Sequence, residues 1–234
     1  MIFKTAAQIS VDAVVFDAYG TLFDVDSVEA IAERLHPGHG RALSHLWRSK
    51  QLEYTWLQSL MQSAHQRRED FAALTAHALD YALERLALAH SPSTRHRLLD
   101  AYLDLSPFAD AEPALAALAP LPRLILSNGT RAMLEPLVAA TGLARHIDTI
   151  LSVDAADVYK PSPRAYQLAV DELKLLPIRV GFISSNGWDV AGAKAFGLTA
   201  IWVNRANAPV ERHGPEPDAM VNSLTALPAL LGKA

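Results

Sequence analysis

Hydrophobic positions follow two different periods along the chain and divide it into three parts. Val11 to Phe16 is a short β-branched apolar run, which is the pattern of a buried strand. Between residues 25 and 105, apolar and aromatic side chains recur at helical spacing and no strand is evident. From residue 106 onward, short apolar runs alternate with amphipathic stretches. The alternation predicts an α/β fold, a parallel sheet with helices on both faces, interrupted by a helical insertion.

Turn signals between these runs predict the limits of each element. Ser27 is the expected cap of the first helix of the insertion, and Ser91-Pro92 opens the last one. The other helices expected in the insertion are 41–64 and 71–88, with a polar turn over 65–70. Outside it, the expected strands are 11–16, 123–126, 147–153, 180–183 and 199–203, and the expected helices are 111–119, 133–140, 164–175 and 188–196. The predicted architecture is a doubly wound, Rossmann-like core of residues 1–24 and 106–234 with an inserted helical cap of residues 25–105.

Composition excludes several classes of protein and site. Of the 234 residues, 50% are hydrophobic, which is enough for a buried core. The net charge is −4 and no basic block occurs, so no nucleic-acid partner is expected. No stretch of about 18 uncharged apolar residues is present, so no membrane span is expected. The absence of cysteine excludes disulfides, thiolate metal sites and a cysteine nucleophile. The expectation is a cytoplasmic protein.

Polar residues cluster at the carboxyl ends of three predicted strands and in the loop between the last two. In chain order they are Asp17, Ser127-Asn128, Lys160, and Ser185-Asn186 with Asp189. The carboxyl ends of parallel strands open into one ligand crevice, so these side chains are expected to face the same site. An isolated lysine or serine is usually an ordinary loop residue, but several complementary clusters together favour a catalytic site.

Asp17 and Thr21 have the spacing of the nucleophile motif of the haloacid dehalogenase superfamily, Asp-x-x-x-Thr, and the stretch around them resembles that motif. Most members of the superfamily are Mg-dependent phosphatases that carry a second Asp two residues after the nucleophile. Tyr19 occupies that position here, and Asn186 stands where such phosphatases usually have another Mg-binding Asp. A phenol is neutral at pH 7 and is a poor magnesium ligand. The two replacements argue against the phosphatase alternative and against a metal site.

Over nearly its full length, the chain resembles the type II L-2-haloacid dehalogenases of this superfamily. The segments that carry the resemblance are Phe16–Asp24, Leu46–Arg48, Gln51–Leu57, Ser127–Gly129, Val158–Pro161 and Ser185–Asp189. The resemblance implies hydrolytic dehalogenation of short-chain (S)-2-haloacids to (R)-2-hydroxy acids, with no metal and no cofactor. The implied partners are a 2-haloalkanoate, halide and a second copy of the chain in a homodimer. A non-catalytic module with the same fold is the other alternative, because a fold alone does not establish an activity.

The resemblance also implies a catalytic set. In it, Asp17 attacks the substrate carbon and carries an ester intermediate. Arg48, from the predicted cap, stabilises the departing halide, and Asp189 positions the water that hydrolyses the ester. The other members of the catalytic set are Thr21, Lys160, Ser185 and Asn186. For Arg48 the alternative is an ordinary solvated helix residue.

A substrate-binding set is implied around these residues, made of Ala18, Tyr19, Leu52, Phe71, Ser127, Asn128, Tyr166 and Trp188. In the family roles, Ser127 and Lys160 hold the substrate carboxylate together with backbone N–H groups that follow Asp17. Asn128 and Trp188 complete the halide site, while Tyr19, Leu52, Phe71 and Trp188 line an apolar pocket. Tyr166 matches a family position, and its alternative role is to orient Lys160.

Overall fold

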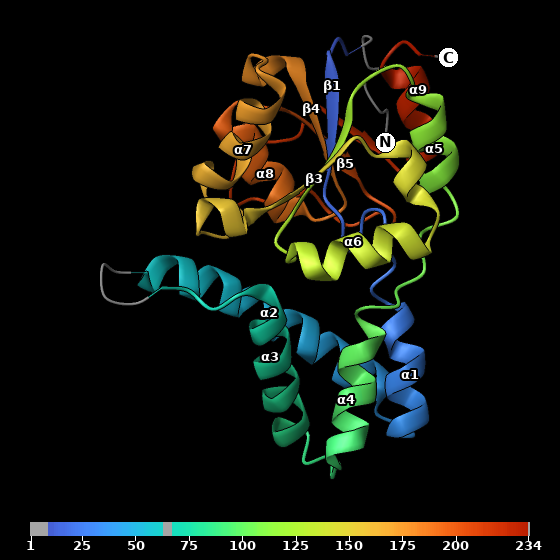
Figure 1. The fold of residues 1–234 in the computed structure, drawn as a ribbon, viewed down its shortest axis with the longest axis vertical. Coiled ribbons are helices and arrows are strands. Elements are labelled where there is room, and N and C mark those ends of the chain that lie inside the picture. The colour runs from blue at the N-terminus through green and yellow to red at the C-terminus, as the bar shows by residue number, and fades with distance from the viewer. Residues whose placement is uncertain (1–8, 63–66, 234) are drawn as a thin grey trace.

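The computed structural model describes residues 9–62 and 67–233. Its centre is a six-stranded sheet in the order β3-β2-β1-β4-β5-β6, in which every neighbouring pair of strands is parallel (Figure 1). The strands are β1 (Ala13–Phe16), β2 (Arg123–Ser127), β3 (Thr149–Ser152), β4 (Val180–Ser184), β5 (Thr199–Val203) and β6 (Ala219–Val221). The first strand of the chain lies inside the sheet and later strands extend it on both sides. This order confirms the predicted doubly wound core.

Helices cover both faces of the sheet. In Figure 1, α7 and α8 lie on one side of it, and α5 and α9 lie on the other. The core helices are α5 (Ala111–Ala117), α6 (Arg131–Ala140), α7 (Pro163–Leu173), α8 (Gly187–Phe196) and α9 (Leu227–Leu230). The short 3-10 helices are η1 (Leu143–His146), η2 (Val153–Ala156), η3 (Pro177–Arg179) and η4 (Leu224–Ala226). Because helices cover both faces, the central strands are apolar along their whole length instead of alternating. All four residues of β1 and all five of β5 are buried.

A helical insertion projects from the sheet between β1 and α5 (Figure 1). Its helices are α1 (Ser27–Leu35), α2 (Gly40–Met61), α3 (Phe71–Arg85) and α4 (Pro92–Ala101). Trp47 of α2 is buried, and its indole N–H donates to the backbone oxygen of Thr75 in α3 at 2.7 Å. A buried aromatic ring with its polar atom satisfied fixes two helices against each other. Within the described ranges, no helix is long and apolar enough to cross a membrane.

The chain enters and leaves the insertion through two segments that lie side by side. Phe23 and Pro107 form an antiparallel bridge. The backbone N–H of Asp24 donates to Ser106 at 2.8 Å, and that of Phe108 donates to Leu22 at 2.9 Å. The entry segment follows the turn after β1 directly, so the insertion is attached next to the end of the central strand. Its exact limits at residues 25 and 105 stay a prediction.

Several predicted limits differ from the structure. Ser27 does not cap α1: Asp26 is the cap residue, and the Ser27 hydroxyl donates to the Asp24 carbonyl at 2.7 Å. The helix predicted to reach residue 88 ends at Arg85, since Ala87 has a φ of 53°. The strand predicted over 147–153 is limited to β3, and both β6 and α9 were not predicted. Residues 63–66, which include the predicted end of the second cap helix, lie outside the described ranges.

Candidate active site

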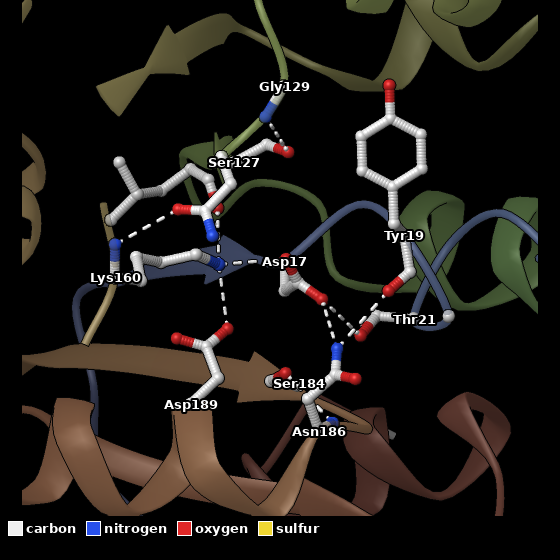
Figure 2. A network of polar contacts seen from close by, with 12 residues as sticks. Asp17, Tyr19, Thr21, Ser127, Gly129, Lys160, Ser184, Asn186 and Asp189 are labelled. Carbon is white, nitrogen blue, oxygen red and sulfur yellow. Dashed lines mark hydrogen bonds and ion pairs between the residues drawn. The ribbon is translucent and has the colours of Figure 1, made fainter. Parts of the chain in front are cut away.

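Asp17 stands directly beyond β1, and its carboxylate is held from three directions (Figure 2). Oδ1 accepts a hydrogen bond from the Lys160 ammonium at 2.8 Å. Oδ2 accepts from the Thr21 hydroxyl at 3.1 Å and from the Asn186 amide nitrogen at 2.8 Å. The residue is only 5% exposed. Charge-assisted hydrogen bonds of this kind fix a carboxylate in one orientation. The structure therefore brings Asp17, Thr21, Asn186 and Lys160 together, as the sequence predicts.

The turn after Asp17 is shaped by Gly20, whose φ of 88° lies in the left-handed region that favours glycine. The turn brings Thr21 back beside Asp17. Ser185 supports this turn from β4: its backbone N–H donates to the Thr21 hydroxyl at 2.9 Å, and its own hydroxyl donates to the Gly20 carbonyl at 2.5 Å. Ser185 thus contacts Thr21 and Gly20 in the turn that positions the Asp17 carboxylate. Within the described residues, it makes no hydrogen bond to Asp17 itself.

Lys160 is the centre of a buried charge cluster. Its ammonium donates to Asp17 at 2.8 Å, to Asp189 at 2.7 Å and to the backbone oxygen of Leu126 at 3.1 Å. Burial alone lowers the pKa of this ammonium, but the charges of the two carboxylates outweigh burial and raise that pKa above its usual value. An ammonium has three N–H donors, and all three are used here. The structure places Lys160 on the two protein carboxylates, and a substrate carboxylate would reach it only by replacing one of these contacts.

Asp189, in the first turn of α8, is completely buried on the other side of Lys160. Its Oδ1 accepts from the Tyr166 hydroxyl at 2.7 Å. Burial raises the pKa of Asp189 to about 6, and the positive charge of Lys160 opposes that rise without cancelling it. Tyr166 is itself buried and also donates to the Asp189 backbone oxygen at 3.1 Å. Its hydroxyl therefore contacts Asp189, and the two roles predicted for Tyr166, binding substrate or orienting Lys160, stay predictions.

Ser127, predicted with Lys160 to hold the substrate carboxylate, lies on the opposite side of the Lys160 ammonium from Asp189 (Figure 2). The Ser127 hydroxyl accepts from the backbone N–H of Gly129 at 3.1 Å, which leaves its own hydrogen for a further acceptor. Asn128 accepts from the backbone N–H of Lys160 at 3.0 Å and so ties the two strand ends together. Among the described residues, the backbone N–H groups of Ala18 and Tyr19 have no acceptor. These groups form a set of donors next to Asp17.

Tyr19 points away from the Asp17 carboxylate (Figure 2). Its ring is buried, 5.6 Å from the ring of Phe71 on the cap helix α3. On the core side it lies so close to Gly129 that a Cβ there would stand 2.8 Å from the ring. Burial raises the pKa of Tyr19, so the phenol stays neutral at pH 7. Tyr19 is thus an apolar wall between core and cap, and it does not replace an acid.

Trp188 and Leu52 are both half-buried, Trp188 on the core helix α8 and Leu52 on the cap helix α2. Trp188, on α8, meets Trp56 of the cap helix α2 edge to face, with ring centroids 5.5 Å apart. Within the described chain, its indole N–H has no partner although it is buried. Leu52 lies one turn before Trp56 on α2. The structure therefore places Trp188 and its free donor against the cap.

Arg48 lies on α2, half-buried, so it is not an ordinary solvated helix residue. Its Nη1 donates to the amide oxygen of Gln51 at 2.7 Å. It also lies near enough to Tyr102 and Tyr19 for its charge to favour the ionised form of both phenols. No hydrogen bond between described residues joins Arg48 to Asp17. The structure places the guanidinium on the cap side of Tyr19 and leaves its catalytic role a prediction.

Comparison with known proteins adds to this geometry. A family model described as a haloacid dehalogenase-like hydrolase matches residues 11–197. The (S)-2-haloacid dehalogenase of Xanthobacter autotrophicus is 49% identical over 83% of this chain and 76% of its own length. That of Pseudomonas sp. strain YL is 42% identical over 96% of both chains. The chain belongs to the L-2-haloacid dehalogenases.

A solved member of this dehalogenase family supports the assignment at the level of structure. The L-2-haloacid dehalogenase from Xanthobacter autotrophicus with chloropropionic acid covalently bound matches with a TM-score of 0.87 and 42% identity. The match covers 95% of this chain and 98% of that one. The predicted family membership is confirmed.

For this dehalogenase family member, the donor set around Asp17 does not suit a magnesium ion. Magnesium needs several oxygen ligands in octahedral order. Here the ammonium of Lys160 occupies the space between Asp17 and Asp189, and the other neighbours of Asp17 are an amide N–H and a hydroxyl. Among the residues that the structure describes, no group of three or more His, Cys, Asp or Glu side chains is placed to hold a metal. The cation of this site is a lysine.

Three residues at the site of this family member were not predicted from the sequence. Ser184 ends β4, and its neighbour Ile183 pairs with Phe16, so Ser184 lies beside Asp17 in the sheet. It is buried, and its hydroxyl accepts from the backbone N–H of Asn186 at 3.1 Å. Successive residues of a strand point to opposite faces of the sheet, and this alternation could have distinguished Ser184 from Ser185. Gln51 and Tyr102 are both buried beside Arg48. Gln51 lies in a segment that carries the family resemblance but was given no role, and Tyr102 gave no signal, because its spacing is that of an ordinary helix residue.

Proposed function

We propose that the protein hydrolyses short-chain (S)-2-haloacids to (R)-2-hydroxy acids and halide through an ester on Asp17. The observation that carries the proposal is the fixed Asp17 carboxylate, which shares the Lys160 ammonium with a second buried carboxylate, Asp189. Relatives similar over most of the chain are (S)-2-haloacid dehalogenases, and a solved relative holds chloropropionic acid covalently. One carboxylate to attack and a second to assist water are the parts that such a reaction requires.

In the first half of the reaction, an Asp17 oxygen attacks the carbon that bears the halogen, in line with the carbon–halogen bond. The carbon–oxygen bond forms, the carbon–halogen bond breaks, and the halide leaves with the electron pair. Attack from the opposite side inverts the carbon, so an (S)-substrate gives an (R)-product. Thr21, Asn186 and Lys160 hold the carboxylate before substrate arrives, and this fixed position lowers the entropic part of the barrier.

In the second half, water attacks the carbonyl carbon of the Asp17 ester and Asp189 takes a proton from that water. The bond between this carbon and the ester oxygen breaks, and the leaving alkoxide takes the proton back from Asp189 and departs as the hydroxy acid. The second proton of the water passes to solvent as Asp17 is regenerated as a carboxylate with one oxygen from water. The pKa of Asp189, raised by burial to about 6, leaves this carboxylate mostly ionised at pH 7 but basic enough to accept a proton.

Hydrogen-bond donors on both sides of the crevice would bind the substrate carboxylate and the departing halide. Ser127 and the backbone N–H groups of Ala18 and Tyr19, which donate to no other described residue, would bind the substrate carboxylate. The buried indole N–H of Trp188, which has no partner among the described residues, would bind halide together with Arg48 and Asn128. Preorganised donors at the place where charge develops are often the largest catalytic contribution.

Halide release from (S)-2-chloropropionate tests the proposal, with p-nitrophenyl phosphate as the substrate of the phosphatase alternative. We expect chloride release by the wild-type protein and none by Asp17→Asn, since an amide is a poor nucleophile. Phosphate release in the presence of magnesium would support the phosphatase instead. A folded wild-type protein that releases neither product would support the non-catalytic module.

We also propose that the protein forms a homodimer through the end of α2. Leu57, Leu60 and Met61 are exposed there, Leu60 at 82%. Trp56 does not belong to this face, because its ring packs against Trp188 of the same chain. Sedimentation at micromolar concentration should show a dimer, and Leu60→Glu should shift it to a monomer; a wild-type monomer would contradict this.

The cytoplasmic location stays a prediction.

A further inference from the structure

A glutamine is completely buried in the middle of the cap. Gln51 lies on α2 with an exposed fraction of 0%. Its amide oxygen accepts from Arg48 Nη1 at 2.7 Å, and its amide nitrogen donates to the Thr75 hydroxyl on α3 at 2.6 Å. Burying an amide is costly unless both of its ends are hydrogen-bonded, and packing alone would be served by leucine. The residue therefore does more than fill space.

The direction of each hydrogen bond in the series that links Arg48, Gln51 and Thr75 is determined. The Thr75 hydroxyl donates its only hydrogen to the backbone oxygen of Phe71 at 2.6 Å, so toward Gln51 it acts as an acceptor. The side chain of Gln51 must then present its nitrogen to Thr75 and its oxygen to Arg48. The Tyr102 hydroxyl donates to the same oxygen at 3.5 Å. The acceptor that holds Arg48 is thus fixed by α3 and cannot flip.

We propose that Gln51 is a positioning residue that holds the Arg48 guanidinium where the departing halide forms. The inference rests on the proposed function, because it acts through Arg48. Gln51 is a neutral acceptor, so it orients Arg48 while the full positive charge remains available to halide. A carboxylate in its place would keep the contact and cancel much of that charge. Hydrophobic residues would keep the charge and lose the orientation.

Two substitutions separate these effects. Gln51→Met keeps the volume and removes the acceptor. Gln51→Glu keeps the shape and the acceptor for Arg48, adds a negative charge and loses the donor to Thr75. Gln58→Met is the matched control on the same helix, since the hydrogen bonds of Gln58 to other described residues are with Glu69 near the surface. The rate of halide release is measured in a single turnover with enzyme in excess, with (S)-2-chloropropionate and (S)-2-bromopropionate. Thermal unfolding of each variant is recorded alongside.

Chloride is the poorer leaving group, so its departure depends more on stabilisation by Arg48 than the departure of bromide does. We expect both Gln51 variants to release chloride about tenfold more slowly or worse, and bromide with a smaller loss, so that the bromide-to-chloride rate ratio rises. Gln58→Met should retain the wild-type ratio. A general structural role would slow both halides equally and leave the ratio unchanged.

The proposal is overturned if Gln51→Met and Gln51→Glu keep the wild-type ratio while Arg48→Lys changes it. It is also overturned if the isosteric Gln51→Glu, with a wild-type melting temperature, releases both halides at wild-type rates. If Gln51→Met does not fold, Gln51→Glu alone decides. Failure of the proposed function gives a different result, because the wild-type protein would then release no halide at all.

Discussion

Lys160→Met removes the single positive charge of a fully buried cluster while keeping most of the side-chain volume. Breaking a buried ion pair by deleting one partner typically costs about 3–5 kcal/mol, because the other charge is left uncompensated. Here the Lys160 ammonium is paired with Asp17 at 2.8 Å and with Asp189 at 2.7 Å, and Lys160 is 1% exposed. We expect a loss of about 3–5 kcal/mol in the free energy of unfolding at pH 8.

The loss should depend on pH. Without Lys160, burial and repulsion from the Asp17 carboxylate hold the pKa of Asp189 in the folded variant above its unfolded value, because the positive charge that opposes this rise is gone. A group with a raised folded pKa contributes stability fully below its unfolded pKa and loses that contribution as pH rises through its folded pKa. The variant should therefore recover about 1–3 kcal/mol between pH 8 and pH 5, where one carboxyl takes up a proton and donates to the other.

Urea unfolding at pH 5 and pH 8, followed by circular dichroism, measures both quantities. Lys194→Met is the control, because Lys194 forms a partly exposed ion pair with Asp218 at 2.6 Å. That substitution should cost no more than about 1 kcal/mol and show little pH dependence. A loss below about 1 kcal/mol for Lys160→Met at pH 8, or an equal loss at both pH values, would refute the reasoning about the buried cluster.

Three further predictions concern the reaction. Burial raises the pKa of Asp189 to about 6 in the free protein, and the negative charge of Asp17 contributes to that rise. Since protonated Asp189 cannot accept a proton from water, kcat should fall as pH drops, with a midpoint below about 6 because Asp17 is an uncharged ester during this step; a kcat that stays flat down to pH 4 would contradict this. Arg48→Lys should lower turnover at least about a hundredfold with folding retained, because a lysine lacks the planar guanidinium group. Near-normal turnover would show that Arg48 has a structural role instead of a catalytic one. Dialysis against EDTA should leave the rate unchanged because Lys160 and Arg48 supply the positive charge, and a loss restored by magnesium would contradict the assignment.

The sequence predicted the sheet well because its strands are buried on both faces, so each appears as an unbroken apolar run. It missed β6 because Ala219–Val221 is three residues long and lies at the sheet edge. It missed α9 for a similar reason, since four residues are too few to show a helical period. Ser27 was misassigned as a cap because its hydroxyl is bound by the preceding turn instead of by α1.

The site was predictable where the topology itself brings residues together. Strand ends meet at one edge of a parallel sheet, and this rule alone places Asp17, Ser127 and Asp189 around one crevice. Contacts that depend on side-chain direction were not predictable. The sequence does not tell that Tyr166 donates to Asp189, or that Gln51 on the cap holds Arg48, because both depend on how helices pack after folding.

The central claim is that Asp17 attacks carbon directly and forms an ester, instead of activating water. Both routes invert the carbon, so the chirality of the product does not distinguish them, but the origin of the new oxygen does. The decisive measurement is one turnover in ¹⁸O water with enzyme in excess, followed by mass analysis of the peptide that holds Asp17 and of the hydroxy acid. We expect label in the Asp17 peptide and almost none in the product hydroxyl. An unlabelled Asp17 peptide with label in the product would contradict the covalent mechanism.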